Sequence, residues 1–412
     1  MSFWAHIVAL GWAFFLHLAA PFHRKARLAV ALRRGWRKQL VDAVGEGGEW
    51  AWLHCASMGE FQDARVAALQ LKSQLPGLKL FATFQSPTGF AQYANHPDLD
   101  AVLLLPFDTP TNARHFLTRL QPRFILFSRS EIWFHYLRQA ARLHIPTFLA
   151  GFRITNSNRY FKLPFRSYYK RCFQHYAHVF CDEAASAELL RAHGFSQRVS
   201  VSGNPRFDRI AELQEGGPIL EEMVLKGPVV VAGSVGAGEM EPLVAAIRTV
   251  SEVEHWIVVP HEVEKEDLKA WEKVLGNGAK RWTAYDKADP FPRILLVDTV
   301  GDLPRFYAAA DLAVVGGGFS KKGIHNVLEP VAQGVPVATG PNHRNYVEAL
   351  ELMESGGMAV FRDGEELKGW IRRNLGNGGM KEELKGYFRE CVGASERISA
   401  AILRHLGDQD AG

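Results

Sequence analysis

Short apolar runs alternate with helix-like segments along most of the chain. The runs of the first half that predict strands are residues 50–56, 78–83, 101–105, 124–127 and 147–150. Residues 110–120 and 132–143 predict helices between them. Continuous apolar strands that alternate with helices are typical of a parallel sheet covered by helices.

The same alternation returns in the second half of the chain. Its predicted strands are residues 229–232, 256–259, 294–297 and 313–315. Between the two halves, residues 202–205 and 216–218 are rich in glycine and proline, which is typical of a linker. We therefore expect an α/β protein with two Rossmann-like domains and a cleft between them.

The length of 412 residues agrees with two domains of about 150 to 200 residues each. We expect an anchor and basic segment over residues 1–40. An N-terminal Rossmann-like domain should cover residues 41–205, and a C-terminal one should cover residues 206–412.

Residues 3–22 are almost entirely apolar or aromatic, and this is about the minimum length that spans a bilayer. Seven Lys and Arg residues follow within residues 24–38, and no acidic residue precedes Asp42. This order predicts membrane attachment with the remainder of the protein in the cytoplasm. A spanning helix and a helix lying in the membrane surface both fit, and a buried core helix is the alternative.

Other features of the composition exclude several classes of site. The net charge of +4 is mild, and the aromatic and basic segment 159–176 lacks the pattern of a nucleic-acid-binding fold around it, so we expect no nucleic-acid partner. The four cysteines show no CxxC pair, and no cluster of His, Cys or acidic residues has metal-ligand spacing. We therefore expect no metal and no disulfide framework.

Residues 311–343 hold the densest group of candidate binding residues. A glycine turn follows the apolar run 313–315, formed by Gly316, Gly317 and Gly318. Such a turn lets the backbone approach a ligand closely. Asn326 and Glu329 then come at the start of a helix-like segment. A strand, a glycine loop and a helix start predict a nucleotide site, with an ordinary crossover turn as the alternative.

Two further strand ends in the second half carry candidate ligand-binding residues. The glycine loop 233–238 lies between a strand and a helix and can present amides and the Ser234 hydroxyl to a phosphate. Pro260 and His261 end the next strand. His261 can pair with a phosphate, although a single histidine in such a position is more often structural.

Two carboxylates follow strand ends in the first half. Glu60 comes at the start of a helix, where an ionised carboxylate can serve as a general base. Glu131 follows the strand 124–127 and should reach the same edge of the sheet. Two carboxylates at one edge are typical of glycosyl chemistry. The alternative is that both merely suit the positive end of a helix, with Arg129 beside Glu131.

Six motifs occur in the order seen in 3-deoxy-D-manno-octulosonic acid (Kdo) transferases, and the chain resembles that family from its N-terminus to about residue 350. The motifs are HCASMGE at 54–60, TFQSPTG at 83–89, EIW at 131–133, GNPRFD at 203–208, DTVGDL at 298–303 and GIHNVLEP at 323–330. Each motif alone is a weak signal, but the six in order are specific.

The resemblance implies an inverting GT-B glycosyltransferase of lipopolysaccharide biosynthesis. Such an enzyme moves Kdo from CMP-Kdo to a lipid A precursor (lipid IVA), and CMP-Kdo is a co-substrate rather than a cofactor. The reaction takes place at the cytoplasmic face of the bacterial inner membrane, where the enzyme also contacts membrane lipids. The resemblance gives Glu60 the role of base, and Glu131 is the candidate supporting acid because of its position at the same edge. It places the donor mainly in the second domain, with Asn326 and Glu329 at the ribose or base and Ser234, Pro260 and His261 around the nucleotide.

The chain departs from the family pattern at three positions. His261 stands where the family usually has Arg, Arg129 stands where it often has an acid, and Ile324 stands where it usually has Gly. A UDP-sugar transferase or epimerase of the same fold is one alternative function. A catalytically silent, membrane-anchored binding protein is another.

Overall fold

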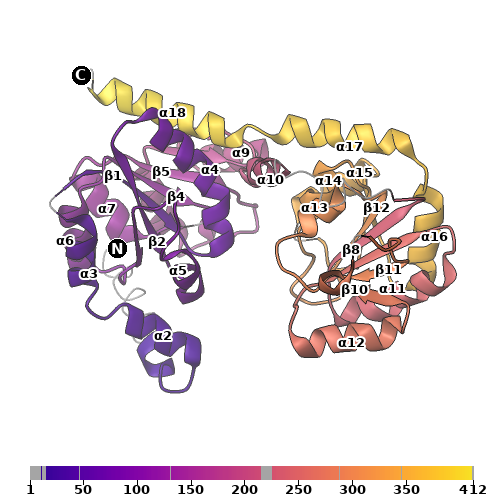
Figure 1. The fold of residues 1–412 in the computed structure, drawn as a ribbon. Helices are drawn as coiled ribbons and strands as arrows, with labels where there is room; N and C mark the ends of the chain where they lie inside the picture. Colours follow the sequence, from indigo (N-terminus) through magenta and orange to yellow (C-terminus); the bar gives the residue numbers. More distant parts are fainter. Residues whose placement is uncertain are drawn as a thin grey trace. The chain divides into compact units, whose positions relative to one another are not determined.

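The computed structural model describes residues 11, 15–45, 47–129, 131–214, 225–286, 288–344 and 346–410. The chain forms two compact units: unit 1 comprises Met1–Arg209 and Val392–Gly412, and unit 2 comprises Ile210–Cys391. Each unit contains a seven-stranded sheet in which every strand pair is parallel (Figure 1). The predicted pair of parallel-sheet α/β domains is confirmed.

The elements of unit 1 follow the predicted alternation. Its strands are β1 (Glu49–Cys55), β2 (Leu78–Phe84), β3 (Ala101–Leu104), β4 (Phe124–Ser128), β5 (Thr147–Phe152), β6 (His178–Cys181) and β7 (Val199–Val201). Its helices are α2 (Arg24–Leu32), α3 (Trp36–Val44), α4 (Met58–Gln74), α5 (Pro87–Tyr93), α6 (Pro110–Leu120), α7 (Phe134–Arg142), η1 (Arg159–Phe161), α8 (Arg166–Gln174), α9 (Ala184–Ala192), the first residues of α10 (Arg206–Gln214), and α18 (Ala394–Asp410).

The sheet of unit 1 has the order β3-β2-β1-β4-β5-β6-β7. Helices α6 and α7 cover one face, where Trp52 packs with Phe116 and Tyr136 at ring-centroid distances of 4.8 and 5.4 Å. Helices α4 and α18 cover the other face. The strand order reverses between β1 and β4, and ligands of open α/β sheets bind at the carboxyl ends of the strands beside such a switch point.

Unit 2 repeats this architecture with different helices. Its strands are β8 (Val229–Val235), β9 (His255–Pro260), β10 (Ala279–Arg281), β11 (Ile294–Leu296), β12 (Leu312–Val315), β13 (Val337–Thr339) and β14 (Met358–Val360). Its helices are α11 (Ala237–Thr249), α12 (Lys265–Leu275), η2 (Trp282–Ala284), α13 (Leu303–Tyr307), α14 (Leu328–Ala332), α15 (Val347–Glu354), α16 (Gly364–Asn374) and α17 (Gly378–Cys391).

The sheet of unit 2 has the order β10-β11-β9-β8-β12-β13-β14, so its switch point lies between β8 and β12. Strand β13 begins at Val337, directly after Pro336, which has no amide hydrogen to donate to the sheet.

The C-terminal segment corrects the predicted domain boundaries. We expected residues 206–412 to form the C-terminal domain, but Val392–Gly412 belongs to unit 1. Helix α18 places Ile398, Ile402 and Leu406 on one face, and these side chains are buried in the core of unit 1. An apolar stripe of this kind needs a matching surface, which α4 and the sheet of unit 1 provide.

The predicted membrane segment, residues 3–22, lies largely outside the described residues. Residues 15–19 are helical, and the side chains of Phe15, Leu18 and Phe22 are 65%, 56% and 89% exposed. In the described part of the chain, no helix is long and apolar enough to cross a membrane.

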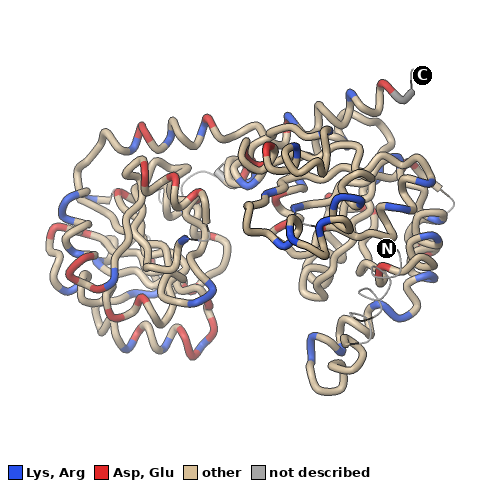
Figure 2. Tube along the Cα trace, turned by 180° about the vertical axis from the view of Figure 1, so that it is seen from behind, with Lys and Arg blue, Asp and Glu red and all other residues tan. Residues whose placement is uncertain are grey.

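The two units differ strongly in charge. Unit 1 contains 28 Lys and Arg against 16 Asp and Glu, a formal net charge of +12, whereas unit 2 contains 20 against 28, a net charge of −8. Figure 2 shows the difference as a predominance of blue segments in unit 1 and frequent red segments in unit 2. The near-neutral total of +4 therefore conceals a basic unit that attracts anions.

Candidate active site

Glu60 lies in the first turn of α4, at the switch point of unit 1, where its side chain takes part in a capping box. The Ser57 hydroxyl accepts a hydrogen bond from the Glu60 amide at 3.4 Å. The Oε2 atom of Glu60 accepts from the amides of Ala56 and Ser57 at 2.6 and 3.3 Å. Its Oε1 atom has no hydrogen-bond partner in the described part of the chain. One oxygen therefore fixes the carboxylate, and the other can accept a proton from a ligand.

The pKa of Glu60 is raised above its ordinary value. The largest cause is burial, and the negative charge of Glu131 adds to it. The amides of Ala56 and Ser57 and the guanidinium of Arg129 act in the opposite direction. A carboxylate with a raised pKa is a stronger base than an exposed one. The alternative of a purely structural first-turn glutamate explains the hydrogen bonds of Oε2, but it explains neither the raised pKa nor an Oε1 atom without a partner among the described residues.

Glu131 is held by two neighbours. Its Oε2 atom accepts a hydrogen bond from Trp133 Nε1 at 2.6 Å and lies 3.0 Å from Nε2 of His54. His54 is fully buried on β1, and its Nδ1 lies 2.8 Å from the Thr83 hydroxyl. The structure thus brings Glu131 and Glu60 to the same edge, as predicted. His54 occurs in a recognised motif, but the sequence offered no sign of its contact with Glu131.

Arg129 occupies the position where the family often has an acid, and it neutralises two other acids here. Its Nη2 atom is 2.6 Å from Asp63 Oδ2, and its Nη1 atom is 4.0 Å from Asp182 Oδ2. Asp63 lies one turn after Glu60 on α4, a spacing that could have indicated its presence at the site. Burial raises the pKa of Asp182 to about 6. Arg209, with Nη1 3.7 Å from Asp63 Oδ1, is the second arginine of this cluster, so two arginines balance the two carboxylates beside Glu60.

In unit 2, a buried carboxylate that the sequence analysis did not single out joins two glycine loops. Glu239 is 2% exposed. Its Oε1 atom accepts hydrogen bonds from the amides of Gly317 and Phe319 at 3.0 and 3.4 Å, and its Oε2 atom accepts from the amide of Gly236 at 2.9 Å. These amides are therefore not available to a phosphate. A glycine cap followed three residues later by Glu is the signal that could have identified Glu239.

The glycine turn after β12 serves the packing of strand ends. A Cβ atom on Gly316 would lie 2.1 Å from the carbonyl oxygen of Ser234, and one on Gly318 would lie 2.5 Å from the amide nitrogen of Gly340. We predicted that these glycines let the backbone approach a ligand. The close approach that the structure shows is to the ends of β8 and β13, because the three strands converge there, and the approach to a ligand stays a prediction.

Ser234, Pro260 and His261 lie at the carboxyl edge of the same sheet. Ser234 has a φ of +51° at a register shift in β8, and Pro260 ends β9. His261 follows and stacks on His325, with a ring-centroid distance of 4.0 Å. Burial, with smaller contributions from the charges of His261 and Lys322, lowers the pKa of His325 to about 4, so its ring is neutral at pH 7.

Asn326 and Glu329 are positioned against each other at the start of α14. The Asn326 amide group donates a hydrogen bond to Glu329 Oε1 at 2.9 Å. The Oδ1 atom of Asn326 accepts from the amide of Leu328 at 3.2 Å. Both side chains are half-buried. This arrangement fixes the orientation of the amide and the carboxylate before any ligand binds.

No group of three or more His, Cys, Asp or Glu side chains in the described ranges is arranged to hold a metal ion. All four cysteines, at positions 55, 172, 181 and 391, are free.

Comparisons with known proteins agree with this architecture. A family model described as 3-deoxy-D-manno-octulosonic-acid transferase (kdotransferase), N-terminal, matches residues 26–209. The 3-deoxy-D-manno-octulosonic acid transferase of Haemophilus influenzae is 25% identical over 402 residues, which cover 90% of this chain and 92% of that protein.

Two solved structures show the same fold. UDP-GlcNAc 2-epimerase from Neisseria meningitidis gives a TM-score of 0.60 at 13% identity, covering 86% of this chain and 100% of its own. MurG from Acinetobacter baumannii gives a TM-score of 0.58 at 14% identity, covering 86% of this chain and 99% of its own.

The fold, two parallel-sheet α/β domains, is the GT-B-like architecture of these solved structures. In sequence, the chain is similar to Kdo transferases over most of its length, and residues 26–209 match their family model. The resemblance carried by the six sequence motifs is therefore confirmed.

Proposed function

We propose that the protein is an inverting glycosyltransferase that moves Kdo from CMP-Kdo to a lipid A precursor in lipopolysaccharide biosynthesis. The observation that carries the mechanism is the geometry of Glu60. One of its carboxylate oxygens is fixed by two backbone amides, the other is open, and its pKa is raised. Similarity to Kdo transferases supports the choice of donor.

In the proposed reaction, Glu60 accepts the proton of an acceptor hydroxyl, and the oxygen of that hydroxyl attacks the anomeric carbon of Kdo. The bond between this carbon and the phosphate oxygen of CMP breaks, and CMP leaves with the electron pair. A single displacement of this kind inverts the configuration at the anomeric carbon. CMP is already an activated leaving group, so orientation and one base are sufficient and no covalent intermediate is needed.

Unit 2 supplies the groups that suit the nucleotide. Helix α11 begins at Ala237, so its first amides and the Ser234 hydroxyl lie at the carboxyl edge of the sheet and can face the phosphate. Asn326 and Glu329 offer an oriented amide and carboxylate to the ribose or base. His261, which stacks on the neutral His325, takes the place of the family's usual arginine and is proposed to donate a hydrogen bond to the phosphate.

The proposed site of action is the cytoplasmic face of the bacterial inner membrane. The apolar residues 3–22, the basic residues that follow them and the net charge of +12 on unit 1 all suit an anionic lipid surface. The lipid A precursor would be presented to Glu60 at that surface.

The rival functions are tested by comparing donors. The purified full-length protein, incubated with lipid IVA in detergent, is expected to release CMP from CMP-Kdo and no UDP from UDP-GlcNAc. The fold is shared with a UDP-GlcNAc 2-epimerase, so UDP-GlcNAc is the most informative rival donor. UDP release or epimerised UDP-GlcNAc, without turnover of CMP-Kdo, would contradict the proposed donor. CMP-Kdo that binds without turnover would support a silent binding protein.

Replacement of Glu131 by Gln should move the acid limb of the pH–rate profile to lower pH. The negative charge of Glu131 raises the pKa of Glu60, so its removal favours the ionised, proton-accepting form of Glu60 at lower pH. The measurement is the transfer rate from about pH 5 to pH 9. Glu188→Gln removes the same charge from an exposed position on α9 and should leave the profile unchanged. An acid limb that does not move in Glu131→Gln would show that the two carboxylates are not coupled.

A further inference from the structure

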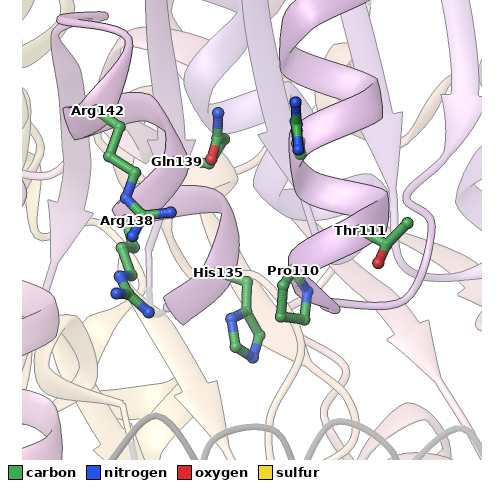
Figure 3. Close-up of a pocket in the computed structure, with 7 residues that line it drawn as sticks. Pro110, Thr111, His135, Arg138, Gln139 and Arg142 are labelled. Carbon is green, nitrogen blue, oxygen red and sulfur yellow. The ribbon is translucent and has the colours of Figure 1, made fainter.

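A positively charged pocket of about 280 Å³ lies between α6 and α7 of unit 1 and has no part in the site described above. Its lining residues are Pro110, Thr111, Arg114, His135, Arg138, Gln139 and Arg142. Figure 3 shows Arg138 and Arg142 extending from α7, with Pro110 and Thr111 on the facing helix and His135 between them. Three of the seven lining residues are arginines and none is acidic.

The three arginines have no counter-charge in the part of the chain that the structure describes. In the ranges that the structure describes, Arg114, Arg138 and Arg142 form no ion pair and no hydrogen bond with other residues. Arg138 and Arg142 are four residues apart on α7, an arrangement in which like charges destabilise a helix. Three guanidinium groups that line one pocket without an acidic partner are expected where an anion balances their charge.

The walls of the pocket are joined by hydrogen bonds before any ligand binds. Asp108, in the loop that leads into α6, accepts hydrogen bonds from the amides of His135 and Tyr136 at 3.0 and 3.2 Å. Thr109 caps α6 by accepting from the amide of Asn112 at 3.2 Å. Asp108 is buried and its carboxylate faces the start of α7, so it fixes that helix to the loop and does not neutralise the arginines. Burial raises its pKa to about 7.

We propose that the pocket between α6 and α7 binds a phosphate group through Arg114, Arg138 and Arg142. Guanidinium groups match the oxygens of a phosphate with two parallel hydrogen bonds each. The volume of about 280 Å³ holds a phosphate with several waters. The site does not depend on the transfer reaction, and its phosphate belongs either to a free anion or to a lipid headgroup.

The first test is binding of inorganic phosphate to the full-length protein, measured by calorimetric titration. Arg138→Gln should weaken binding by about tenfold or more, the usual effect of losing a charge-assisted hydrogen bond. Arg142→Gln, at an exposed position where folding is not at risk, should do the same. The matched control is Arg404→Gln, which removes an exposed, unpaired arginine from α18 on the opposite face of the sheet and should bind phosphate like the wild type.

The second test uses vesicles of phosphatidylcholine with and without phosphatidic acid, and it separates the two sources. If the Arg138→Gln and Arg142→Gln variants lose phosphate binding but are retained on both kinds of vesicle like the wild type, the ligand is a free phosphate. Phosphatidic acid should increase the amount of protein retained on the vesicles. If the two variants lose this increase but bind phosphatidylcholine vesicles like the wild type, and Arg404→Gln keeps the increase, the ligand is a headgroup phosphate. If both properties of the two variants equal those of the wild type, or if the wild type binds neither probe, the proposal is overturned.

Discussion

Glu60→Gln is expected to lower the turnover of CMP-Kdo by about 10²- to 10⁴-fold, the usual contribution of a general base. A glutamine side chain cannot take the proton of the acceptor hydroxyl. Its amide oxygen can still accept the hydrogen bonds from Ala56 and Ser57, so the start of α4 should remain capped. The rate should therefore fall without a change in the free energy of unfolding. The measurement is the initial rate of CMP release, with urea unfolding of the same protein.

The nucleotide provides the internal control for this variant. The groups proposed to hold CMP lie in unit 2, whereas Glu60 lies in unit 1. CMP should therefore bind Glu60→Gln with the affinity of the wild type. Turnover close to that of the wild type would remove Glu60 from the mechanism and leave only its capping role.

Gly316→Ala is expected to destabilise unit 2 by about 3 kcal/mol or more, at the upper end of the cost of overpacking. The added Cβ atom would lie 2.1 Å from the carbonyl oxygen of Ser234 and 2.7 Å from the Cα atom of Val235. These are backbone atoms, so the clash cannot be relieved by rotating a side chain. CMP binding should be lost as well, because Ser234 and the turn before α14 would be displaced together.

A matched glycine distinguishes this effect from a general loss of backbone freedom. A Cβ atom on Gly278 would have no atom within 4 Å, so Gly278→Ala should leave stability unchanged or slightly raised. Urea unfolding of the three proteins provides the comparison. An unfolding midpoint for Gly316→Ala equal to that of the wild type would show that the strand ends separate more easily than the structure indicates.

Much of the fold could be predicted from the sequence because its strands are buried on both faces. Such strands appear as unbroken apolar runs, and their order along the chain gives a parallel sheet. The same logic placed Glu60 and Glu131 at one edge, since the residues after parallel strands share that edge. The structure confirms that both acids lie there.

Contacts between distant residues could not be predicted in this way. Glu239 joins two loops that are about 80 residues apart, and nothing in a local pattern indicates which amides a carboxylate will meet. The return of α18 to unit 1 depends on a surface that exists only after the sheet has formed. The arginine pocket combines side chains from two helices that are separate in sequence and adjacent in space.

The central claim is tested most directly by the mass of the lipid product. Full-length protein, CMP-Kdo and lipid IVA are incubated in detergent, and the lipid is analysed by mass spectrometry. We predict that lipid IVA gains the mass of one or more Kdo residues and that one CMP is released for each Kdo transferred. Glu60→Gln should yield almost no modified lipid. Unmodified lipid IVA after complete incubation with the wild-type protein would contradict the account.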